Sequence, residues 1–298
     1  MLASAPSIHI LDPSRCHLGE GPSYDPVTDT AWWVDILEAR LFERSLREGD
    51  SPARIHKLPF LASDVAAIDT HRQLLSAEDG LYVRTIIDGS LSRLCPLEAE
   101  IAGNRSNDGR VHPSGALWIG TMNREAETGR GAIYHVAGTR VTRLYGGLTT
   151  PNGIAFSPDG ATGYFVDTEE GVLRRVRLDP ATGLPVAEPE THYDHSNGEG
   201  GIDGAAVDVD GLIWTARFGA ACLDAYSPEG ERVRTVAVPV RQPTCPTFAG
   251  RDLDRLLVTS GYEGMDASAR AADPDHGRTL LVEVGARGLL EPAFRLDV

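Results

Sequence analysis

The sequence predicts an all-β fold, a six-bladed β-propeller with four-stranded antiparallel blades. The first observation behind this prediction is a repeat, in which a polar residue, a short apolar strand, a turn and a second strand recur about six times along the 298 residues. Its period of roughly 40 to 50 residues is the span of one propeller blade. The second observation is that the apolar runs are short, rich in Val, Ile, Trp, Tyr and Thr, and separated by turn residues. Six blades use nearly the whole chain, so we expect a single domain over residues 1–298.

The repeat aligns on its polar first residues, here called the leader residues. They lie 41 to 51 residues apart, by subtraction of their numbers, and are Glu20, Asp64, Asn107, Asn152, Asp203 and Thr244. The clearest copies join segments 20–26 and 31–35 in the first blade, 152–160 and 163–167 in the fourth, and 203–211 and 212–215 in the fifth. Each leader is therefore expected to start the first strand of its blade.

Turn sequences separate the expected strands. Pro and Gly occur together with Asp or Glu in segments 157–160, 179–183 and 227–230, and such clusters favour β-turns. Segment 208–211 is interpreted as the turn between the first two strands of the fifth blade, because the bidentate Glu of an EF-hand is missing at the required offset. No long stretch has the 3.6-residue apolar periodicity of a helix, so helix is expected to be a minor component.

The tryptophans and cysteines fit the same framework. Three tryptophans are expected in the core, on the second strands of their blades: Trp33, Trp118 and Trp214. Only Trp32 is a candidate for exposure. The cysteines are scattered and contain no CxxC pair: Cys16, Cys95, Cys222 and Cys245. Isolated thiols of this kind are typical of buried small hydrophobes, and a disulfide between blades is the alternative.

Charge and composition narrow the class of partner. The net charge of −15, from 28 basic and 43 acidic residues, argues against nucleic acid or an anionic membrane as a partner. It indicates a solvated acidic surface, and part of it can serve cation binding. The N-terminus has no basic and continuous apolar signal region, and no apolar stretch approaches the roughly 20 residues of a membrane span. We expect a cytoplasmic protein, as a monomer or weak homo-oligomer.

The leader residues suggest a functional site. The innermost strands of a propeller line its central channel, so the leaders of different blades are expected to meet at one end of that channel. Glu20, Asn152 and Asp203 would then form a cluster of two carboxylates and one amide oxygen. Hard oxygen ligands of this kind suit a divalent cation such as Ca²⁺, Mg²⁺ or Mn²⁺. Each of these residues alone is also common in turns or on solvated strands, so the prediction depends on their shared register.

The chain resembles the SMP-30/gluconolactonase/luciferin-regenerating family, which includes regucalcin and bacterial sugar lactonases. The matching motifs run in order through almost the whole chain: Leu18-Gly19-Glu20-Gly21-Pro22 with 33–36, Asn104-Arg105-Ser106-Asn107-Asp108-Gly109 with 120–122, Pro151-Asn152-Gly153-Ile154-Ala155, and Ile202-Asp203-Gly204 with 212–216. Segments 250–253 and 259–260 resemble the last blade.

This resemblance implies a six-bladed propeller with one catalytic divalent metal in the channel. The family's metal ligands fall on Glu20, Asn152 and Asp203, and its substrate-binding positions fall on Arg105, Asn107 and Glu125. Ca²⁺ is the expected ion, and an all-oxygen site also accepts Zn²⁺, Mn²⁺, Mg²⁺ or Fe²⁺. Members of the family hydrolyse aldonolactones, so the resemblance implies a metal-dependent sugar lactonase with a small-molecule sugar lactone as its partner.

The residue types are compatible with lactone hydrolysis. That reaction needs a polarised carbonyl, a nucleophilic water and stabilisation of the oxyanion. Asp203 is the predicted general base, because a carboxylate beside the metal can accept a proton from water. Arg105 offers a planar set of donors for sugar oxygens, and a structural salt bridge is its alternative role. Asp108 is expected either to bond locally within segment 107–109 or to act directly in catalysis.

Other chemistries find less support. The chain has no Gly-x-Ser-x-Gly nucleophile motif and no HExxH zinc motif. His192 and His195 lie in or beside a glycine-rich loop, residues 194–201, and are expected to be exposed to solvent. That loop is either a lid or a lengthened connection. Segment 259–264 departs from the family pattern, in which an Arg often precedes Glu-Gly, and is expected to border the channel mouth.

Two other functions fit the same residues. A non-catalytic propeller could bind calcium or another divalent metal as a scaffold, and an esterase could act on non-sugar esters. The pairing of Arg105 with Asn107 favours the lactonase, because a scaffold needs no sugar-binding donors beside the metal.

Overall fold

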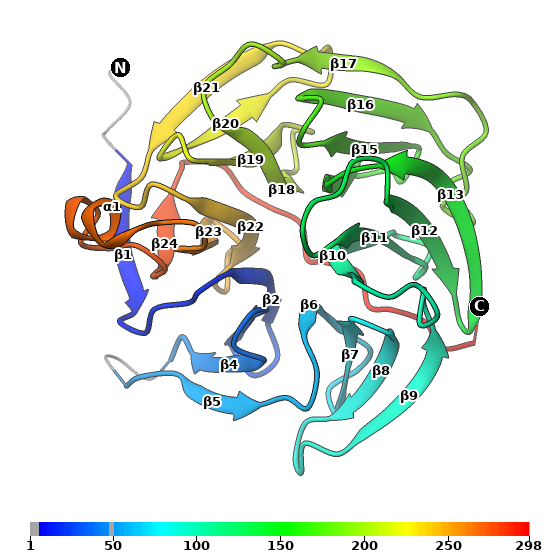
Figure 1. Cartoon of the computed structure of the whole chain (residues 1–298), viewed down its shortest axis with the longest axis horizontal. Coiled ribbons are helices and arrows are strands. Elements are labelled where there is room, and N and C mark those ends of the chain that lie inside the picture. The colour runs from blue at the N-terminus through cyan, green and yellow to red at the C-terminus, as the bar shows by residue number, and fades with distance from the viewer. Residues whose placement is uncertain (1–5, 48–50, 298) are drawn as a thin grey trace.

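The computed structural model describes residues 6–47 and 51–297, which form six four-stranded antiparallel sheets arranged as a ring (Figure 1). The first two blades contain β2 (Gly19–Asp25), β3 (Thr30–Asp35), β4 (Arg40–Ser45) and β5 (Arg54–Lys57), then β6 (Ala62–Ala67), β7 (Arg72–Ala77), β8 (Gly80–Thr85) and β9 (Leu91–Pro96). The third and fourth contain β10 (Asn104–Val111), β11 (Leu117–Asn123), β12 (Gly131–Ala137) and β13 (Arg140–Leu148), then β14 (Pro151–Phe156), β15 (Thr162–Asp167), β16 (Val172–Arg177) and β17 (Glu190–Asp194). The predicted six-bladed β-propeller is confirmed.

The last two blades complete the ring. They contain β18 (Gly201–Val207), β19 (Ile213–Phe218), β20 (Cys222–Tyr226) and β21 (Arg232–Ala237), then β22 (Pro243–Ala249), β23 (Arg255–Ser260), β24 (Thr279–Glu283) and β1 (Ser7–Asp12). The N-terminal strand β1 pairs antiparallel with β24, so the sixth blade is built from both ends of the chain. This pairing closes the ring by hydrogen bonds between segments about 270 residues apart, by subtraction.

Each leader residue lies in the innermost strand of its blade, as predicted, and each of these strands has a β-bulge there. The register shifts fall between Glu20 and Ser23, Ala62 and Asp64, Ser106 and Gly109, Asn152 and Ala155, Ile202 and Ala205, and Pro243 and Pro246. A bulge bends a strand and changes the direction of the side chains beside it. The repeat in the sequence therefore corresponds to a repeated distortion of the backbone at the ring centre.

Glycine makes two of these bulges possible. Gly21 and Gly153 have φ of +50° and +63°, a left-handed conformation that side chains disfavour. A Cβ on Gly21 would also lie 2.6 Å from the Cα of Asp64 in the next blade. The glycines after Glu20 and Asn152 therefore let neighbouring innermost strands approach closely.

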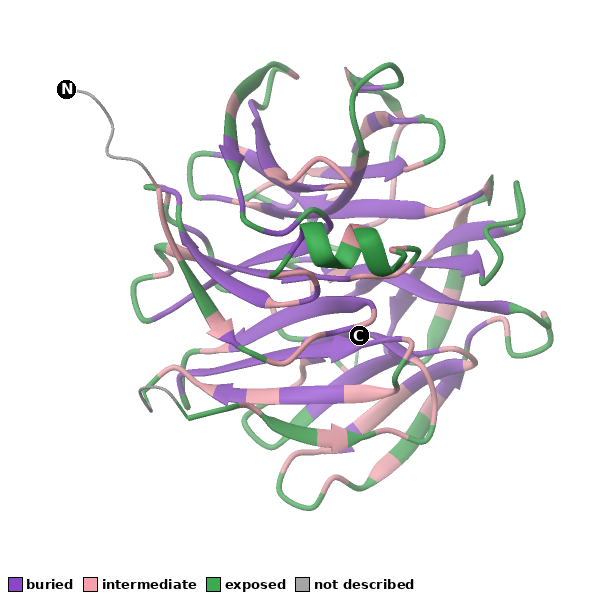
Figure 2. Ribbon diagram, turned by 60° about the vertical axis from the view of Figure 1, so that its left-hand side comes forward, coloured by how far each residue is buried: buried purple, intermediate pink, exposed green. Residues whose placement is uncertain are grey.

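The core lies between the blades, where both faces of the inner strands are buried (Figure 2). Trp33, Trp118 and Trp214 are 0 or 1% exposed, which confirms their predicted packing in the core. The expectation that Trp32 is exposed is wrong, because it is only 4% exposed. The guanidinium of Arg84, from the second blade, lies 5.5 Å from the centre of the Trp32 ring. The neighbouring blade therefore covers the side of the strand that period-two alternation had assigned to solvent.

The small amount of helix and the state of the cysteines also agree with the predictions. The short helix α1 (Ala267–Ala272) lies in the connection between β23 and β24 and has no buried residue. All four cysteines are free; Cys16, Cys95 and Cys245 are buried and Cys222 is half-buried. No helix within the described residues has the length and apolar character needed to cross a membrane.

The C-terminal segment, residues 284–297, crosses the face of the ring that is turned away from the viewer in Figure 1. Backbone N–H groups of Phe294 and Arg295 donate to the carbonyls of Ala67 and Gly115. The carboxylate of Glu291 forms an ion pair with Arg110, from the innermost strand β10. The segment thus ties the second, third and sixth blades together at one end of the channel.

We expect Phe294→Ala to lower the free energy of unfolding by about 3–5 kcal/mol. Phe294 is only 1% exposed and packs in the core cluster between the second and third blades, so truncation leaves a cavity there. Urea unfolding followed by tryptophan fluorescence measures the change. Leu290→Ala is the matched control, because Leu290 belongs to the same segment but is 50% exposed; equal losses in both variants would contradict this role for Phe294.

Candidate functional site

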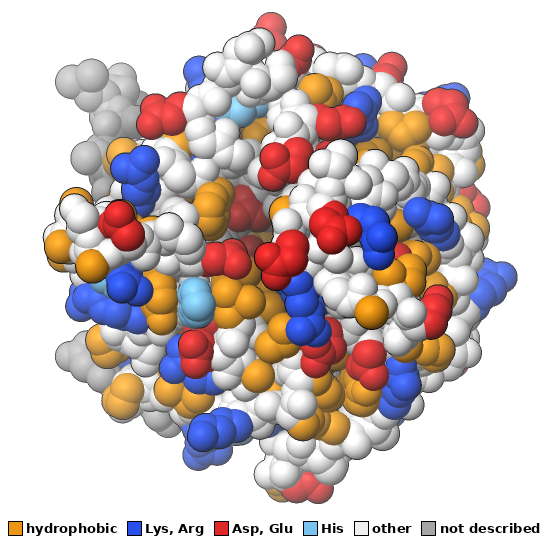
Figure 3. Space-filling view, viewed as in Figure 1, with side chains coloured by type: hydrophobic (Ala, Val, Ile, Leu, Met, Phe, Trp, Pro, Cys, Tyr) orange, Lys and Arg blue, Asp and Glu red, His pale blue; other side chains and the backbone are white. Residues whose placement is uncertain are grey.

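The three predicted metal ligands lie in the innermost strands of three blades, on the face of the ring that carries α1. Glu20 is in β2, Asn152 in β14 and Asp203 in β18, and all three are buried. Figure 3 shows this face, where acidic side chains border a hollow at the ring centre. The bulges place each of these residues directly before or within the distorted part of its strand. Their role as metal ligands remains a prediction.

The two carboxylates of this cluster have strongly raised pKa values. Burial raises the pKa of Glu20 well above its ordinary value, and the charges of Asp203 and Asp108 raise it further. Burial likewise raises the pKa of Asp203, with contributions from Asp108 and Glu263. The guanidinium of Arg105 acts in the opposite direction on both. The cation-free protein therefore disfavours ionisation of this pair, because burial and neighbouring carboxylates outweigh the effect of Arg105.

Arg105 and Asn107 join this cluster through hydrogen bonds. Arg105 Nη1 donates to Asn107 Oδ1 at 2.7 Å and to the backbone carbonyl of Ser106 at 2.8 Å. Asn107 Nδ2 in turn donates to Asn152 Oδ1 at 2.8 Å and to the carbonyl of Pro151 at 3.1 Å. The two predicted substrate-binding residues of β10 are thus in contact with the predicted ligand of β14, and Arg105 makes these contacts rather than the salt bridge that was its alternative.

The donor set fits a hard divalent cation. Carboxylate and amide oxygens are the ligands that Ca²⁺, Mg²⁺ and Mn²⁺ prefer, and two buried carboxylates gain most from a positive charge between them. Among the described residues no three His, Cys, Asp or Glu side chains form a metal-binding group. The amide oxygen of Asn152 stays the predicted third protein ligand beside Glu20 and Asp203.

Asp108 makes a contact between blades. Its Oδ2 accepts a hydrogen bond of 2.7 Å from the backbone N–H of Ile154 in β14. The segment 107–109 is a bulge within β10 and not a turn, and Asp108 also accepts the expected local bond, from the backbone N–H of Gly109. Burial raises the pKa of Asp108 to about 6, although Arg110 acts against the shift. A direct catalytic role for Asp108 stays a prediction.

Asp64, the leader of the second blade, lies near the same charges. Burial raises its pKa to about 7; the charge of Asp108 adds to the shift and that of Arg110 opposes it. Its buried Oδ2 has no hydrogen-bond partner among the described residues. An ionised Asp64 is therefore costly for the folded protein at alkaline pH.

We expect Asp64→Asn to stabilise the protein at about pH 8, by up to roughly 4 kcal/mol at 1.36 kcal/mol per pKa unit. The folded pKa of about 7 lies above the ordinary 3.8, so folding favours the protonated form, and stability falls as pH rises from 3.8 through 7. The amide stays neutral throughout. Urea unfolding of wild type and variant across this pH range, in a chelator, measures the difference; an advantage that does not shrink as pH falls would contradict it.

Glu125 is exposed, unlike the buried residues of this cluster. It follows β11 in an exposed loop, and its backbone N–H is held by Asn123 Oδ1 at 3.0 Å. Within the described residues its carboxylate makes no hydrogen bond to Arg105 or Asn107. Its contact with substrate stays a prediction.

The charge of Glu263 acts on residues of the site, although the sequence analysis had singled out only segment 259–264 and not this residue. Burial lowers the pKa of Arg105, and the charges of Glu263 and Glu20 are the main opposing influences. The backbone of Glu263 is fixed, because its N–H donates to the carbonyl of His17 and its carbonyl accepts from Gln242 Nε2 at 3.1 Å. The departure from the family pattern at 259–264 was the signal that could have identified it.

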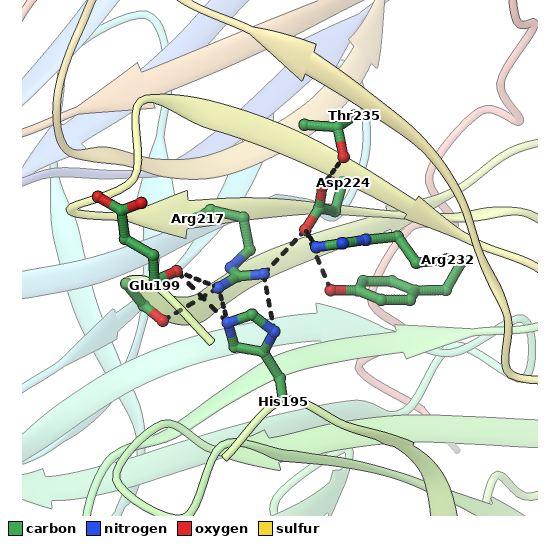
Figure 4. A network of polar contacts seen from close by, with 8 residues as sticks. His195, Glu199, Arg217, Asp224, Arg232 and Thr235 are labelled. Atoms are coloured by element: carbon green, nitrogen blue, oxygen red, sulfur yellow. Dashed lines mark hydrogen bonds and ion pairs between the residues drawn. The ribbon is translucent and has the colours of Figure 1, made fainter. Parts of the chain in front are cut away.

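The loop of residues 194–201, which connects the fourth blade to the fifth, is held by Arg217 of the fifth blade (Figure 4). Arg217, in β19, donates to the backbone carbonyls of Glu199 and Gly200 and pairs with Asp224 at 2.8 Å. His195 Nδ1 lies 3.2 Å from Arg217 Nη1. These contacts favour a lengthened connection over a lid.

The expectation that His192 and His195 are exposed is wrong. They are 7% and 8% exposed. His192 Nε2 lies 3.0 Å from the carbonyl of Ser227 in the next blade, and His195 packs against Arg217. Burial lowers the pKa of both rings. Their glycine-rich surroundings are covered because the fourth blade packs against the fifth, a contact that local composition does not reveal.

A cavity with a mainly apolar lining lies elsewhere in the described residues. It has a volume of about 400 Å³ and is bounded by Arg110, Phe156, Phe248 and Leu290. These residues come from the far ends of the innermost strands and from the C-terminal segment, so the cavity is on the face opposite the leader residues. The charged cluster, and not this cavity, is the better candidate site because it brings together titratable groups with perturbed pKa values.

Comparison with known proteins places the chain in a family. Residues 18–262 match the model of the SMP-30/Gluconolactonase/LRE-like region. A protein of Rhizobium meliloti (strain 1021), provisionally named a sugar lactone lactonase, is 53% identical over 96% of both chains. Pentonolactonase XacC of Haloferax volcanii is 32% identical, again over 96% of both chains.

Solved structures agree with these matches. A calcium-binding protein, regucalcin from Agrobacterium tumefaciens, superposes with a TM-score of 0.95 at 48% identity and covers 97% of this chain and 98% of its own. A luciferin-regenerating enzyme superposes with a TM-score of 0.89 at 25% identity, over 99% of this chain and 100% of its own. The family resemblance inferred from the motifs around the leader residues is confirmed: this chain belongs to the SMP-30/gluconolactonase/LRE-like family.

Proposed function

We propose that this protein hydrolyses the ester bond of a sugar lactone and uses a divalent cation held by Glu20, Asn152 and Asp203. The observation that carries the proposal is the cluster at the channel end, where two buried carboxylates with raised pKa values adjoin the Arg105–Asn107–Asn152 hydrogen bonds. The names of the Haloferax pentonolactonase and of the Rhizobium relative support the reaction class. The calcium-binding regucalcin supports the cation, with Ca²⁺ as the first candidate.

Each side chain has a distinct part in this proposal. Asp203 accepts the proton of the attacking water as an ionised carboxylate beside the cation. Arg105 has five N–H donors, and the hydrogen bonds described above use only those of Nη1; the others can bind substrate oxygens. Asn107 and Glu125 supply further polar contacts to sugar hydroxyls. The cation, when bound, would polarise the lactone carbonyl and lower the pKa of water.

Hydrolysis of a lactone panel tests the proposal. A pH-indicator assay with five- and six-membered aldonolactones, each with Ca²⁺, Mg²⁺, Mn²⁺, Fe²⁺ or Zn²⁺, should identify at least one pair with activity well above the uncatalysed rate. Simple non-sugar esters serve as the comparison. Activity on those esters alone would favour the esterase, and tight cation binding without hydrolysis of any substrate would favour a metal-binding scaffold.

A further inference from the structure

A directed chain of hydrogen bonds continues beyond the predicted ligand Asn152. Asn152 Nδ2 donates to Thr168 Oγ1 at 2.9 Å, and Thr168 Oγ1 donates to the backbone carbonyl of Ile202 at 2.8 Å. Thr168 directly follows β15, beside Asn152 in the fourth blade, whereas Ile202 belongs to β18 of the fifth. Together with the bonds from Arg105 and Asn107, this chain of hydrogen bonds runs from the third blade through the fourth to the fifth.

Both ends of the chain allow only one direction. A guanidinium can only donate and a backbone carbonyl can only accept, so Arg105 must contact Asn107 Oδ1 and Thr168 must donate to Ile202. The orientation of each amide between them follows: the Nδ2 atoms of Asn107 and Asn152 both point toward the Ile202 end of the hydrogen-bond chain. Asn152 Oδ1 therefore faces Asn107 and keeps one lone pair, because an amide oxygen has two.

Thr168 and Asn107 together fix which atom of Asn152 is available to a cation. Without the Thr168 hydroxyl, Asn152 Nδ2 loses its acceptor, and only the bond from Asn107 Nδ2 still holds Oδ1 on the cation side. Thr168 also holds the carbonyl of Ile202, the residue directly before Asp203. Gly201 leaves space for this contact, since a Cβ there would lie 2.5 Å from Thr168 Cγ2.

We propose that Thr168 is a positioning residue of the cation site, which orients the Asn152 oxygen and the start of the Asp203 strand without binding the cation itself. This inference rests on the cation site of the proposed function. Partners that orient metal ligands in this way typically change metal affinity by about 10–100-fold when they are removed.

Thr168→Val tests the proposal, because valine keeps the shape of threonine and removes only the hydroxyl. Calorimetric titration of chelator-stripped protein with Ca²⁺ should give a Kd about 10–100-fold weaker than wild type. Thr168→Ser keeps the oxygen and should bind Ca²⁺ nearly as wild type does. Saturating Ca²⁺ should restore most of the kcat of Thr168→Val, which a general loss of structure would not allow. Thermal unfolding in chelator checks the fold, and Thr168→Ala replaces the valine variant if that variant fails to fold.

The outcomes separate the two proposals. A wild-type Kd in Thr168→Val, or equal weakening in Thr168→Ser, overturns the role of Thr168. Wild-type protein that binds Ca²⁺ but hydrolyses no lactone overturns the proposed function alone. Wild-type protein that binds no divalent cation overturns both.

Discussion

Asp203→Asn is expected to lower kcat/KM for lactone hydrolysis by about 10²–10⁴-fold, the usual contribution of a general base. The amide keeps the shape of the side chain but cannot accept the proton of the attacking water. It also removes one of the two charges that would hold the cation. Steady-state kinetics with the best substrate and cation of the panel measure the loss.

The same variant should be at least as stable as wild type in a chelator at neutral pH. Burial, Asp108 and Glu263 all raise the pKa of Asp203, so its ionised form is disfavoured by folding and a neutral amide relieves that cost. Loss of activity together with equal or higher Tm is the signature of a functional residue that is costly for stability. Asp252→Asn, at an exposed position, is the control for removing one carboxylate. Retention of more than a tenth of wild-type kcat/KM would reject Asp203 as the base.

Removal of divalent cations with a chelator should abolish hydrolysis, and adding back Ca²⁺ should raise Tm. A ligand at a hundredfold excess over its Kd stabilises the folded state by about 2.7 kcal/mol. The physical reason is burial and repulsion among carboxylates: burial raises the pKa of both Glu20 and Asp203, the charges of Asp203 and Asp108 raise that of Glu20 further, and Asp108 and Glu263 do so for Asp203. A cation between them removes this repulsion. An unchanged Tm and full activity in the chelator would contradict a bound cation.

Cation binding should also release protons and weaken as pH falls. The raised pKa values mean that the cation-free protein keeps protons on this pair at pH values where ordinary carboxylates are ionised, and the cation competes with those protons. Calorimetric titrations at one pH in two buffers of different ionisation enthalpy measure the number released. Glu20→Gln should release fewer protons and bind Ca²⁺ more weakly. Binding that does not depend on pH would place the cation elsewhere.

The period of the repeat was enough to predict the propeller, because each blade is a local unit with its own strands and turns. The leader residues proved to mark real structural positions, at the bulges of six innermost strands. Strand β1 was not predicted. Its partner β24 lies at the other end of the chain, and no local pattern within residues 7–12 specifies a partner so distant.

Burial was the property that local composition predicted least well. Trp32, His192 and His195 were each expected to be exposed, and neighbouring blades or strands cover them. Period-two alternation assigns one face of a strand to solvent, but in a propeller both faces of an inner sheet pack against other blades. The same contacts hide Asp64, whose raised pKa depends on Arg110 and Asp108.

By itself the sequence determined the repeating unit, the number of blades and the family, since these depend on residue types and spacings along the chain. It also marked Glu20, Asn152 and Asp203 through their common register. Only the tertiary structure decided that burial and neighbouring carboxylates raise the pKa of Glu20 and Asp203, and that the amide of Asn152 is oriented by Asn107 and Thr168. The reason is physical: charge coupling and hydrogen-bond direction depend on distances of a few ångströms and on exclusion of water, and folding sets both between residues far apart in the chain.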